Sequence, residues 1–591
     1  MTVSLRRFAV SAMSFCCAAL VAGAAVLPAF AQTSATAEAD APAESPADDA
    51  AELETVAVAA LSGHQTVLSD IDFLGGLAGN PGLSGIVTFF SGGALEVLDG
   101  SRPIGVVVQT DGAQFTPIVC LPVADIDRLL QVGENFNLEP IDAGNGVYEL
   151  EANDQVLFFK NVGQWTFAAQ SVDALDLAPA DPAATLQSLV DSYDLGVTLR
   201  AANVPEIYRE IALEQLREGM EQGLEQEADE SDEDFAKRRE LAQAQVEQIE
   251  DLIKGLDTLT VGWNIDAENR QTFLEVVAIA APKTDMALAM TAYRPSSTGV
   301  SGFHRPESAA SLLTHGDTPD ELLEKQQEQI EAAIATFRKQ ADKAISESEE
   351  GPLADPDMRE ALRSAANDLI DVYAQMARDG DAELAGSLDL SGEGWDLIAA
   401  AKVSDPEKVE SAFKKVAEAA SKDESFPGVE WGYAEHAGVK LHGMSAPVPE
   451  NGQARDTLGE SVRLIMGVGN ERVYFAAGPR GEEALKAAID RSASMADQEV
   501  MPAEVIVSLK QVLTAAKKVA PPQQAGMIGM VLDGLEQTAE GKDHLRVTVE
   551  AAESGRGARI RYLLEEGVLA AIGKAAAAAG NQMQGGAPGG F

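Results

Sequence analysis

Two segments about three hundred residues apart share one pattern, and this repeat constrains the fold more than any other feature of the chain. The first, Val156 to Leu175, reads VLFFKNVGQWTFAAQSVDAL, and the second, Val462 to Leu485, reads VRLIMGVGNERVYFAAGPRGEEAL. Each contains an apolar run, a Val-Gly turn, a second apolar run ending in Phe-Ala-Ala, and a polar stretch that closes on Ala-Leu. The pattern predicts a β-hairpin that leads into a short helix.

Further matches follow in the same order. Ala168-Ala169 and Ala476-Ala477 are 308 residues apart, and the runs that begin at Val197 and Val507 are 310 apart. Such short motifs match by chance, but a shared order at a nearly constant offset indicates a duplication. We therefore predict an α+β fold with two related halves, each an antiparallel sheet with packed helices and a long helical hairpin. The expected ranges are about 55–294 and 300–574.

The helical hairpins are predicted at about 205–256 and 319–379. In the first, Ala242, Val246, Ile249, Ile253 and Leu256 recur at spacings of 4, 3, 4 and 3, which is typical of a coiled-coil seam. The acidic run Glu225 to Asp234 between its helices is either a solvated loop, as charge runs usually are, or a site for cations or a partner. The second hairpin opens with Thr318, Pro319 and Glu321, a capping box with proline at the first helical position.

The N-terminus has the features of an export signal. Arg6 and Arg7 precede the apolar run Phe8 to Leu27, and Ala29-Phe30-Ala31 is a small-residue cleavage site before Gln32. A retained membrane anchor is the alternative, but no stop-transfer pattern follows. We expect residues 1–31 to be a signal peptide and the mature chain to be periplasmic or extracellular. Residues 32–54, rich in alanine, proline and acids, predict a disordered linker, and 575–591 a flexible tail.

Composition excludes several functions. The formal charge is −50, and residues 1–31 contain two arginines and no acid, so the mature chain would carry about −52. Such a chain repels nucleic acids and anionic membrane surfaces and binds cations only weakly. No later stretch approaches the roughly 20 apolar residues of a transmembrane helix. Cys120 is the only cysteine after the signal, so no intramolecular disulfide is possible, and its apolar surroundings predict a buried thiol.

No chemical motif stands out. His436 and His442 are six residues apart and could approach one another across a turn, but zinc needs three or four ligands, so two ordinary surface histidines are the simpler interpretation. Gly467-Val468-Gly469 lacks the third glycine of a dinucleotide loop, and Gly82-Leu83-Ser84-Gly85 is not a nucleophile elbow. The four tryptophans fall at predicted strand positions and favour packing roles. We assign no catalytic, cofactor-binding or metal-binding residue.

The stretches SRPIGVVVQTDGAQFTPIVCLPVADIDRLL, VPEIYREIALEQLREGMEQGLEQ, GKDHLRVTVE and EEGVLAAIG resemble a family of exported proteins from planctomycete-type bacteria. The resemblance covers almost the whole mature chain. That family has no assigned activity, so the resemblance implies export and a shared architecture, and no site residues.

Two hypotheses of different classes remain for function. One is a non-catalytic envelope protein with a structural or partner-binding role, whose partner would be another protein or an envelope component. The other is a periplasmic carrier of a lipid or other apolar ligand, held between sheet and helices. A large apolar cavity would favour the carrier and a filled core the first hypothesis. An enzyme comes third, and a pocket with convergent histidine, aspartate and serine side chains would support it.

Overall fold

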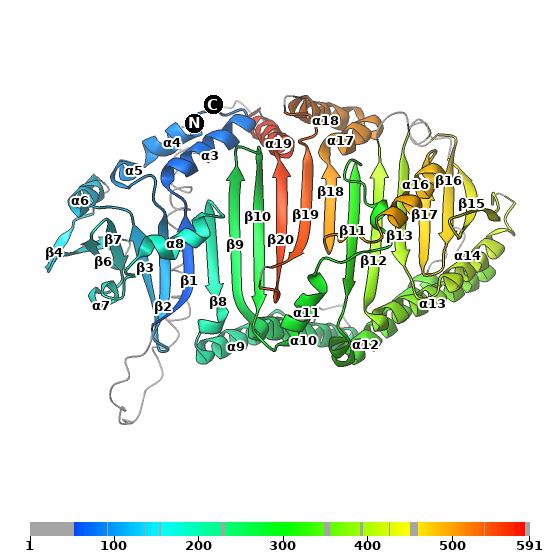
Figure 1. Ribbon diagram of the computed structural model, residues 1–591, viewed down its shortest axis with the longest axis horizontal. Coiled ribbons are helices and arrows are strands. Elements are labelled where there is room, and N and C mark those ends of the chain that lie inside the picture. The colour runs from blue at the N-terminus through cyan, green and yellow to red at the C-terminus, as the bar shows by residue number, and fades with distance from the viewer. Residues whose placement is uncertain are drawn as a thin grey trace, which may run out of the picture. The chain divides into compact units, whose positions relative to one another are not determined.

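The computed structural model describes residues 53–585 apart from short gaps. The gaps are residues 92, 136–137, 153–154, 225, 227–230, 348–354, 391–393, 425, 449–454, 456–458, 537 and 553. The chain divides into two compact units, Met1–Met286 and Ala287–Phe591. Both combine helices with antiparallel strands, which confirms the α+β class (Figure 1). The predicted signal peptide, nearly all of the linker and half of the acidic run lie outside the described residues.

The described strands of the first unit form an antiparallel sheet. Its order is β10-β9-β8-β1-β2-β3-β7-β6-β5-β4. The strands are β1 (Glu54–Leu61), β2 (Ile104–Thr110), β3 (Phe115–Leu121), β4 (Ile141–Gly144), β5 (Val147–Ala152), β6 (Gln155–Val162), β7 (Trp165–Ala169), β8 (Leu195–Arg200), β9 (Leu256–Asp266) and β10 (Gln271–Ala280).

Helices fill four of the connections in this unit. Between β1 and β2 lie α3 (His64–Leu77), α4 (Leu83–Phe90) and α5 (Ala94–Val97), and between β3 and β4 lies α6 (Ile126–Asn135). Between β7 and β8 lie α7 (Val172–Leu175) and α8 (Pro182–Val190). Between β8 and β9 lie α9 (Glu206–Gly223) and α10 (Asp232–Gly255), and α11 (Asp285–Ala289) follows β10.

A row of glycines lets α8 approach the sheet closely. Gly105 and Gly196 both lie opposite Ala60, and Gly196 lies opposite Gly262, so small residues cross four neighbouring strands. A Cβ on Gly105 would lie 2.3 Å from the side chain of Leu186 on α8. One on Gly262 would lie 2.3 Å from the ring of Tyr193. The core forms on this face, and both Leu186 and Tyr193 belong to it.

The described strands of the second unit also form an antiparallel sheet. Its order is β20-β19-β18-β11-β12-β13-β17-β16-β15-β14. The strands are β11 (Ala310–Asp317), β12 (Asp381–Asp389), β13 (Asp396–Lys402), β14 (Glu430–His436), β15 (Val439–Pro447), β16 (Ser461–Val468), β17 (Arg472–Ala477), β18 (Ala503–Ser508), β19 (His544–Ala551) and β20 (Gly557–Glu565).

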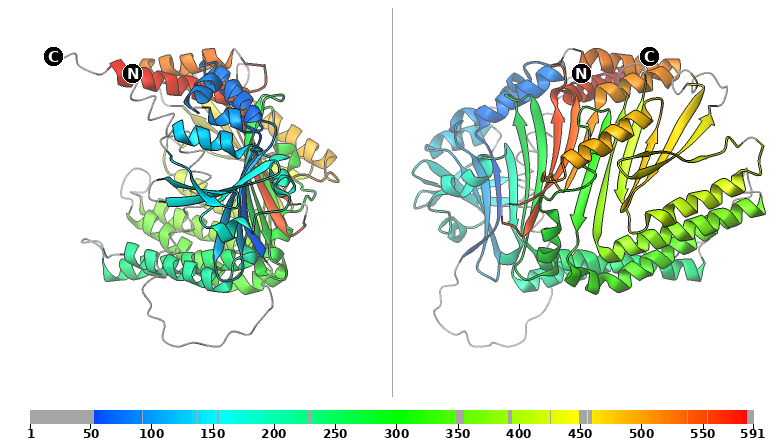
Figure 2. Two further views of the ribbon diagram at one scale, coloured as in Figure 1. Left: turned by 90° about the vertical axis from the view of Figure 1, so that its left-hand side faces the viewer. Right: turned by 45° about the vertical axis from the view of Figure 1, so that its right-hand side comes forward.

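The helices of this unit lie in the same kinds of connection. Between β11 and β12 lie α12 (Asp320–Glu347) and α13 (Pro356–Asp379), and between β13 and β14 lies α14 (Pro406–Ala420). Between β17 and β18 lies α16 (Gly481–Ser494), and between β18 and β19 lie α17 (Leu509–Val519) and α18 (Pro522–Leu535). The chain ends in α19 (Glu566–Gly585). Figure 2 shows α16 on one side of this unit's sheet, while α12, α13, α17 and α18 lie at the ends of its strands.

The core of the second unit lies between its sheet and α16. Leu485, Ala488 and Ile489 of α16 pack against strand residues such as Ile398 and Ala476. The short 3-10 turn η4 (Ser301–Phe303) enters the same core, where Phe303 and Val300 are fully buried. The space between sheet and helix is therefore filled by side chains.

Asp-Pro dipeptides start three of the helices. Asp181 accepts a hydrogen bond from the Ala184 backbone nitrogen at 3.0 Å at the start of α8, and Asp405 accepts one from Lys408 at 2.9 Å at the start of α14. Asp355 caps α13 through the backbone nitrogen of Asp357 at 2.8 Å. In each case proline occupies the first turn, where its missing N–H costs nothing.

Both predicted helical hairpins are present, as α9–α10 and α12–α13. They occupy different connections, because the first lies between β8 and β9 and the second between β11 and β12. The chain also differs from expectation at its C-terminal end. α19 continues to Gly585, so residues 575–585 are helical where the sequence suggested a flexible tail, since their alanine-rich composition has high helix propensity.

Candidate functional site

The sheet face of the second unit that packs against α16 carries a buried network of polar side chains. Ser311 Oγ lies 2.6 Å from His304 Nδ1, and His304 Nε2 lies 2.8 Å from Glu504 Oε2. The backbone nitrogen of Arg305 donates to Ser311 Oγ at 2.8 Å. With Glu504 ionised, the Nε2–H of His304 donates to its carboxylate.

Electrostatics keep Glu504 ionised. Burial acts to raise the pKa of this carboxyl, but the hydrogen bond from His304 and the charges of His304 and Arg546 outweigh it, so the pKa lies below its ordinary value. Arg546 Nη1 is 3.4 Å from Glu504 Oε1. The charge is therefore compensated by Arg546 of β19 and by His304, which follows η4.

A second part of the network is centred on Arg305. Its Nη2 donates to Asp396 Oδ1 and its Nε donates to Ser387 Oγ, each at 2.6 Å. Arg480 Nη2 lies 3.2 Å from the other Asp396 oxygen. Asp396 and Arg305 are both buried, so this is an ion pair taken out of water and held by additional hydrogen bonds.

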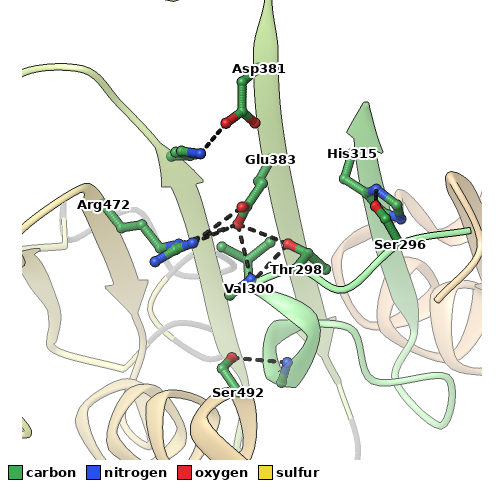
Figure 3. A network of polar contacts seen from close by, with 11 residues as sticks. Ser296, Thr298, Val300, His315, Asp381, Glu383, Arg472 and Ser492 are labelled. Carbon is green, nitrogen blue, oxygen red and sulfur yellow. Dashed lines mark hydrogen bonds and ion pairs between the residues drawn. The ribbon is translucent and has the colours of Figure 1, made fainter. Parts of the chain in front are cut away.

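Glu383 of β12 ties the same segment to the sheet (Figure 3). Arg472 Nη2 lies 3.1 and 3.0 Å from its two carboxylate oxygens. Its Oε2 also accepts hydrogen bonds from Thr298 Oγ1 at 2.8 Å and from the Gly299 backbone nitrogen at 3.0 Å. In the same view Ser492 of α16 accepts a hydrogen bond from the Gly302 backbone nitrogen at 2.9 Å. The network thus holds residues 298–305 between the strands and α16.

The Ser311, His304 and Glu504 arrangement has the partners of a catalytic triad but not the access. Ser311 is 3% exposed, and its Oγ already accepts from a backbone N–H. A triad serine must face a cleft where a carbonyl can be attacked. Two clefts of about 270 and 220 Å³ lie away from Ser311, one lined by residues of α12 and α13 and the other by residues around α18 and the turn that follows it. The network is positioned to fix the fold.

From β20 to β17 the opposite face of the same sheet is apolar, and farther along it carries Lys440 and His442 of β15. Cross-strand pairing places Leu312, Val505, Val547 and Tyr562 side by side on four strands. We call the following set, defined by this pairing, the open apolar face: Leu312, Leu384, Leu388, Ala399, Phe475, Val505, Val507, Leu545, Val547, Val549, Tyr562 and Leu564.

Several members of the open apolar face are accessible to water. Leu384 is 40% exposed, Phe475 41%, Leu545 37% and Tyr562 45%, and none of the twelve is charged. A soluble sheet normally turns its apolar side to the core and its polar side to water. Here the buried face carries the hydrophobic core together with the polar network, and the accessible face is apolar as well, which makes it a candidate binding surface.

The first unit has a smaller patch of the same kind. Val197 lies opposite Val261, and Trp263 lies opposite Leu274, on the face away from the glycine row. All four side chains are exposed. The Trp263 indole donates to Thr272 Oγ1 at 2.8 Å, so its polar atom is satisfied within the sheet while its ring remains accessible.

The first unit also contains a buried carboxyl pair. Asp70 of α3 is hydrogen-bonded to Asp194, which precedes β8 and accepts hydrogen bonds from the Ile265 backbone nitrogen at 2.6 Å and from Ser62 Oγ at 3.3 Å. Burial, the negative charge of Asp194 and their shared hydrogen bond raise the pKa of Asp70 to about 7. Closely placed buried carboxyls disfavour a second negative charge, which is why the pKa of Asp70 is raised.

The two neighbouring histidines of the sequence do not converge. His442 is buried against the ring of Trp431 and accepts a hydrogen bond at Nδ1 from the Gly432 backbone nitrogen at 2.9 Å. His436 instead pairs with Asp490 of α16, at 2.9 Å. Among the described residues, no three His, Cys, Asp or Glu side chains are placed to hold a metal ion.

Cys120 lies in the core of the first unit, and burial raises the pKa of its thiol to about 12, as expected for an unreactive cysteine. Of the tryptophans, Trp165 is buried, while Trp263 and Trp431 are more than a third exposed. No described helix is long and apolar enough to cross a bilayer.

Sequence reasoning missed the polar network and the open apolar face. The available signal was alternation along β11 and β18, where Ser311 and Glu504 alternate with Leu312 and Val505. Alternation of polar and apolar residues separates the two faces of a strand, but it does not show which face a helix covers. Comparison with protein families, with curated proteins and with solved structures finds no match to this chain.

Proposed function

We propose that the protein is a non-catalytic binding protein that holds an apolar ligand, such as the acyl chains of a lipid, on its open apolar face. The observation that carries the proposal is that the sheet of the second unit is apolar on both faces, with a filled core on one face and water-accessible apolar side chains on the other. Leaving such a face in water is costly, at about 25 cal/mol for each Å².

The chemistry of the face favours an apolar ligand over a protein partner. Protein interfaces of standard size carry about ten hydrogen bonds and are enriched in arginine. The open apolar face has no charged side chain, and Tyr562 supplies its only hydroxyl. The filled core beneath α16 counts against a ligand held between sheet and helices, which is the arrangement that the sequence suggested for a carrier. The ligand proposed here would lie instead on the outside of the sheet. A protein or envelope partner on the same face is the other outcome of the test.

The test uses the purified full-length protein and a fluorescent fatty acid as the probe. Replacing two exposed members of the face, Leu545→Gln with Tyr562→Gln, should weaken probe binding at least tenfold. Val172→Gln is the matched control, because Val172 is an equally exposed apolar residue on α7 of the first unit. Native mass spectrometry of protein from its own envelope should show bound lipid. Equal probe binding by all three proteins, or a bound polypeptide in place of lipid, would contradict the proposal.

We also propose that the two units descend from one duplicated domain. When the strands of each unit are numbered from its own first strand, both orders read 10-9-8-1-2-3-7-6-5-4. α6 and α14 lie in equivalent connections, and so do the pairs α9–α10 and α17–α18. Ten strands have a very large number of possible orders, so agreement by chance is remote.

An experimental structure tests the duplication. Aligned on the faces that pack on α8 and α16, the pairing makes Ile118 equivalent to Ile398 and Ala169 equivalent to Ala476. Superposing the two units should bring these pairs together. A superposition that places them in different strands would disprove common descent.

Export remains part of the proposal, supported by the signal pattern before Gln32 and by the resemblance to exported proteins described above. N-terminal sequencing of the exported protein should read from Gln32. A mature chain that begins before Ala29 would contradict cleavage.

A further inference from the structure

One segment of the first unit carries no charge at all. From Leu74 to Leu95 the sequence contains no Asp, Glu, Lys, Arg or His, although 23% of the chain is Asp, Glu, Lys or Arg. A stretch of this length would be expected to carry about five charges at that frequency. The segment includes the end of α3, the turn that follows it and the whole of α4.

The uncharged segment forms an exposed apolar helix. α4 has no buried residue, and Phe89 is 80% exposed, Ile86 42% and Val87 36%. Phe89 and Phe90 are in edge-to-face contact with ring centroids 5.4 Å apart. An isolated exposed phenylalanine is ordinary, but three adjoining apolar side chains on one uncharged helix form a surface that water disfavours.

The hairpin of α3 and α4 is held in shape without these side chains. Asp72 on α3 accepts hydrogen bonds from the backbone nitrogen of Ser84 at 3.0 Å and from its hydroxyl at 2.5 Å, near the start of α4. Gly75 has no Cβ where one would lie 3.0 Å from Leu83, so the helices approach closely. The Asn80 backbone nitrogen closes the turn on the Gly75 carbonyl at 2.8 Å. The exposed residues are thus free to contact something else.

The length of α4 and the charge of the chain indicate which kind of surface these exposed residues contact. Eight helical residues span about 12 Å, far less than the roughly 30 Å of a bilayer core, so α4 cannot cross a membrane. It can lie in the interface, where an apolar helix face enters about 5–10 Å and aromatic rings are favoured. The chain carries a net charge of −50, which opposes a second copy and an anionic surface alike. The uncharged surface of α4 on such an acidic chain is therefore suited to contact with a lipid surface that carries no net charge.

We infer that the α3–α4 hairpin docks the protein onto zwitterionic lipid bilayers, with Ile86, Val87 and Phe89 inserted in the interface. The inference does not depend on the ligand proposed for the second unit. Basic residues, which bring many peripheral helices to anionic lipids, are absent from the segment, so binding does not require anionic lipid.

Flotation with phosphatidylcholine vesicles tests the inference on the full-length protein. The wild-type protein should float with the vesicles, and the variant Ile86→Ser with Phe89→Ser should partition at least tenfold less. Both residues are exposed, so the thermal unfolding of the variant should match the wild type. Ile207→Ser is the matched control, since Ile207 is 61% exposed on α9, and it should float as the wild type does.

A spectroscopic probe reports insertion directly. Phe89→Trp should shift its emission to shorter wavelength on addition of phosphatidylcholine vesicles and be quenched by brominated lipid. Failure of the wild-type protein to bind these vesicles, binding that appears only with anionic lipid, or equal flotation of the serine variant would overturn the inference. So would self-association without vesicles that the serine variant abolishes, because the surface would then be an interface between copies.

Discussion

Single titratable residues in both units connect the stability of the protein to pH. Asp70 is the clearest case in the first unit, because burial and the nearby Asp194 raise its pKa to about 7. A carboxyl whose pKa is higher in the folded state favours folding at low pH. Ionisation of this buried carboxyl destabilises the folded state. The loss of stability begins as pH rises above the pKa of about 4 in the unfolded chain and is complete above about 7.

We therefore predict that Asp70→Asn stabilises the protein at pH 8, by about 1–3 kcal/mol. The gain should shrink toward pH 4.5, because an amide cannot ionise and the wild-type carboxyl is then protonated. Urea unfolding at the two pH values measures it. Asp72→Asn on the same helix is the control, because hydrogen bonds from Ser84 lower the pKa of Asp72 and no gain at pH 8 should follow. An equal gain at both pH values would show that charge is not the cause.

His442 gives the stability of the second unit the opposite dependence on pH. Burial lowers the pKa of its imidazole, with Lys414 and Lys440 adding to the effect and Glu410 opposing it. Its Nδ1 accepts from the Gly432 backbone nitrogen, so protonation would break that hydrogen bond. A histidine with a lowered folded-state pKa contributes stability above its unfolded value of about 6.5 that is lost as pH falls.

The wild-type protein should lose stability as pH falls from 7.5 to 5. We predict that this loss is smaller by roughly 1 kcal/mol in His442→Asn. The Asn carbonyl can accept the same backbone hydrogen bond and does not titrate. Thermal unfolding across this range compares the variant with the wild type, and His436→Asn on the same hairpin is the control variant. Parallel pH profiles of the wild type and His442→Asn would remove His442 as the cause.

At the scale of elements, the sequence motif that identified the repeat is displaced by one residue between the units. In β7, Phe167 is 3% exposed and belongs to the core, while Phe475 at the same place in the second motif is 41% exposed. The core of β17 is instead formed by Ala476, with Tyr474 packed against it. The motif predicted both hairpins correctly, but identical letters on adjacent positions of a strand point to opposite faces.

Close approach of elements explains why some small residues are irreplaceable. Gly262→Ala should destabilise the first unit by about 1–3 kcal/mol, because the added Cβ would lie 2.3 Å from the Tyr193 ring, a rigid group in the core. Gly219→Ala is the matched control, since nothing lies within 4 Å of its Cβ in α9. Alanine there should stabilise the helix by about 0.5–1 kcal/mol. Urea unfolding measures both, and similar effects of the two substitutions would contradict close packing at Gly262.

At the scale of the whole molecule, composition and local pattern predicted the class of fold, the helical hairpins and the buried Cys120. They could not predict strand order, since β18 pairs with β11, almost two hundred residues earlier. They also could not predict the candidate surface. Val505 and Val507 alternate with Glu504 and would ordinarily be placed in the core, yet here residues 298–305 and α16 pack on the face with Glu504. Which face is covered depends on distant segments.

Net charge is a property that only the whole chain has, and it yields a last prediction. The chain has 94 acidic and 44 basic side chains, so 50 acids stay uncompensated even if every base is paired. Their mutual repulsion opposes the compact state. Raising NaCl from about 0.01 M to 0.1 M shortens the screening length from about 30 Å to 10 Å, which weakens this repulsion more than it weakens contact pairs. The melting temperature should rise by about 2–4 °C for each kcal/mol of electrostatic repulsion that the salt removes. Sucrose at equal osmolality is the control, because it leaves the electrostatic repulsion unchanged. A melting temperature that falls with salt would show that the ion pairs of the fold outweigh its net charge.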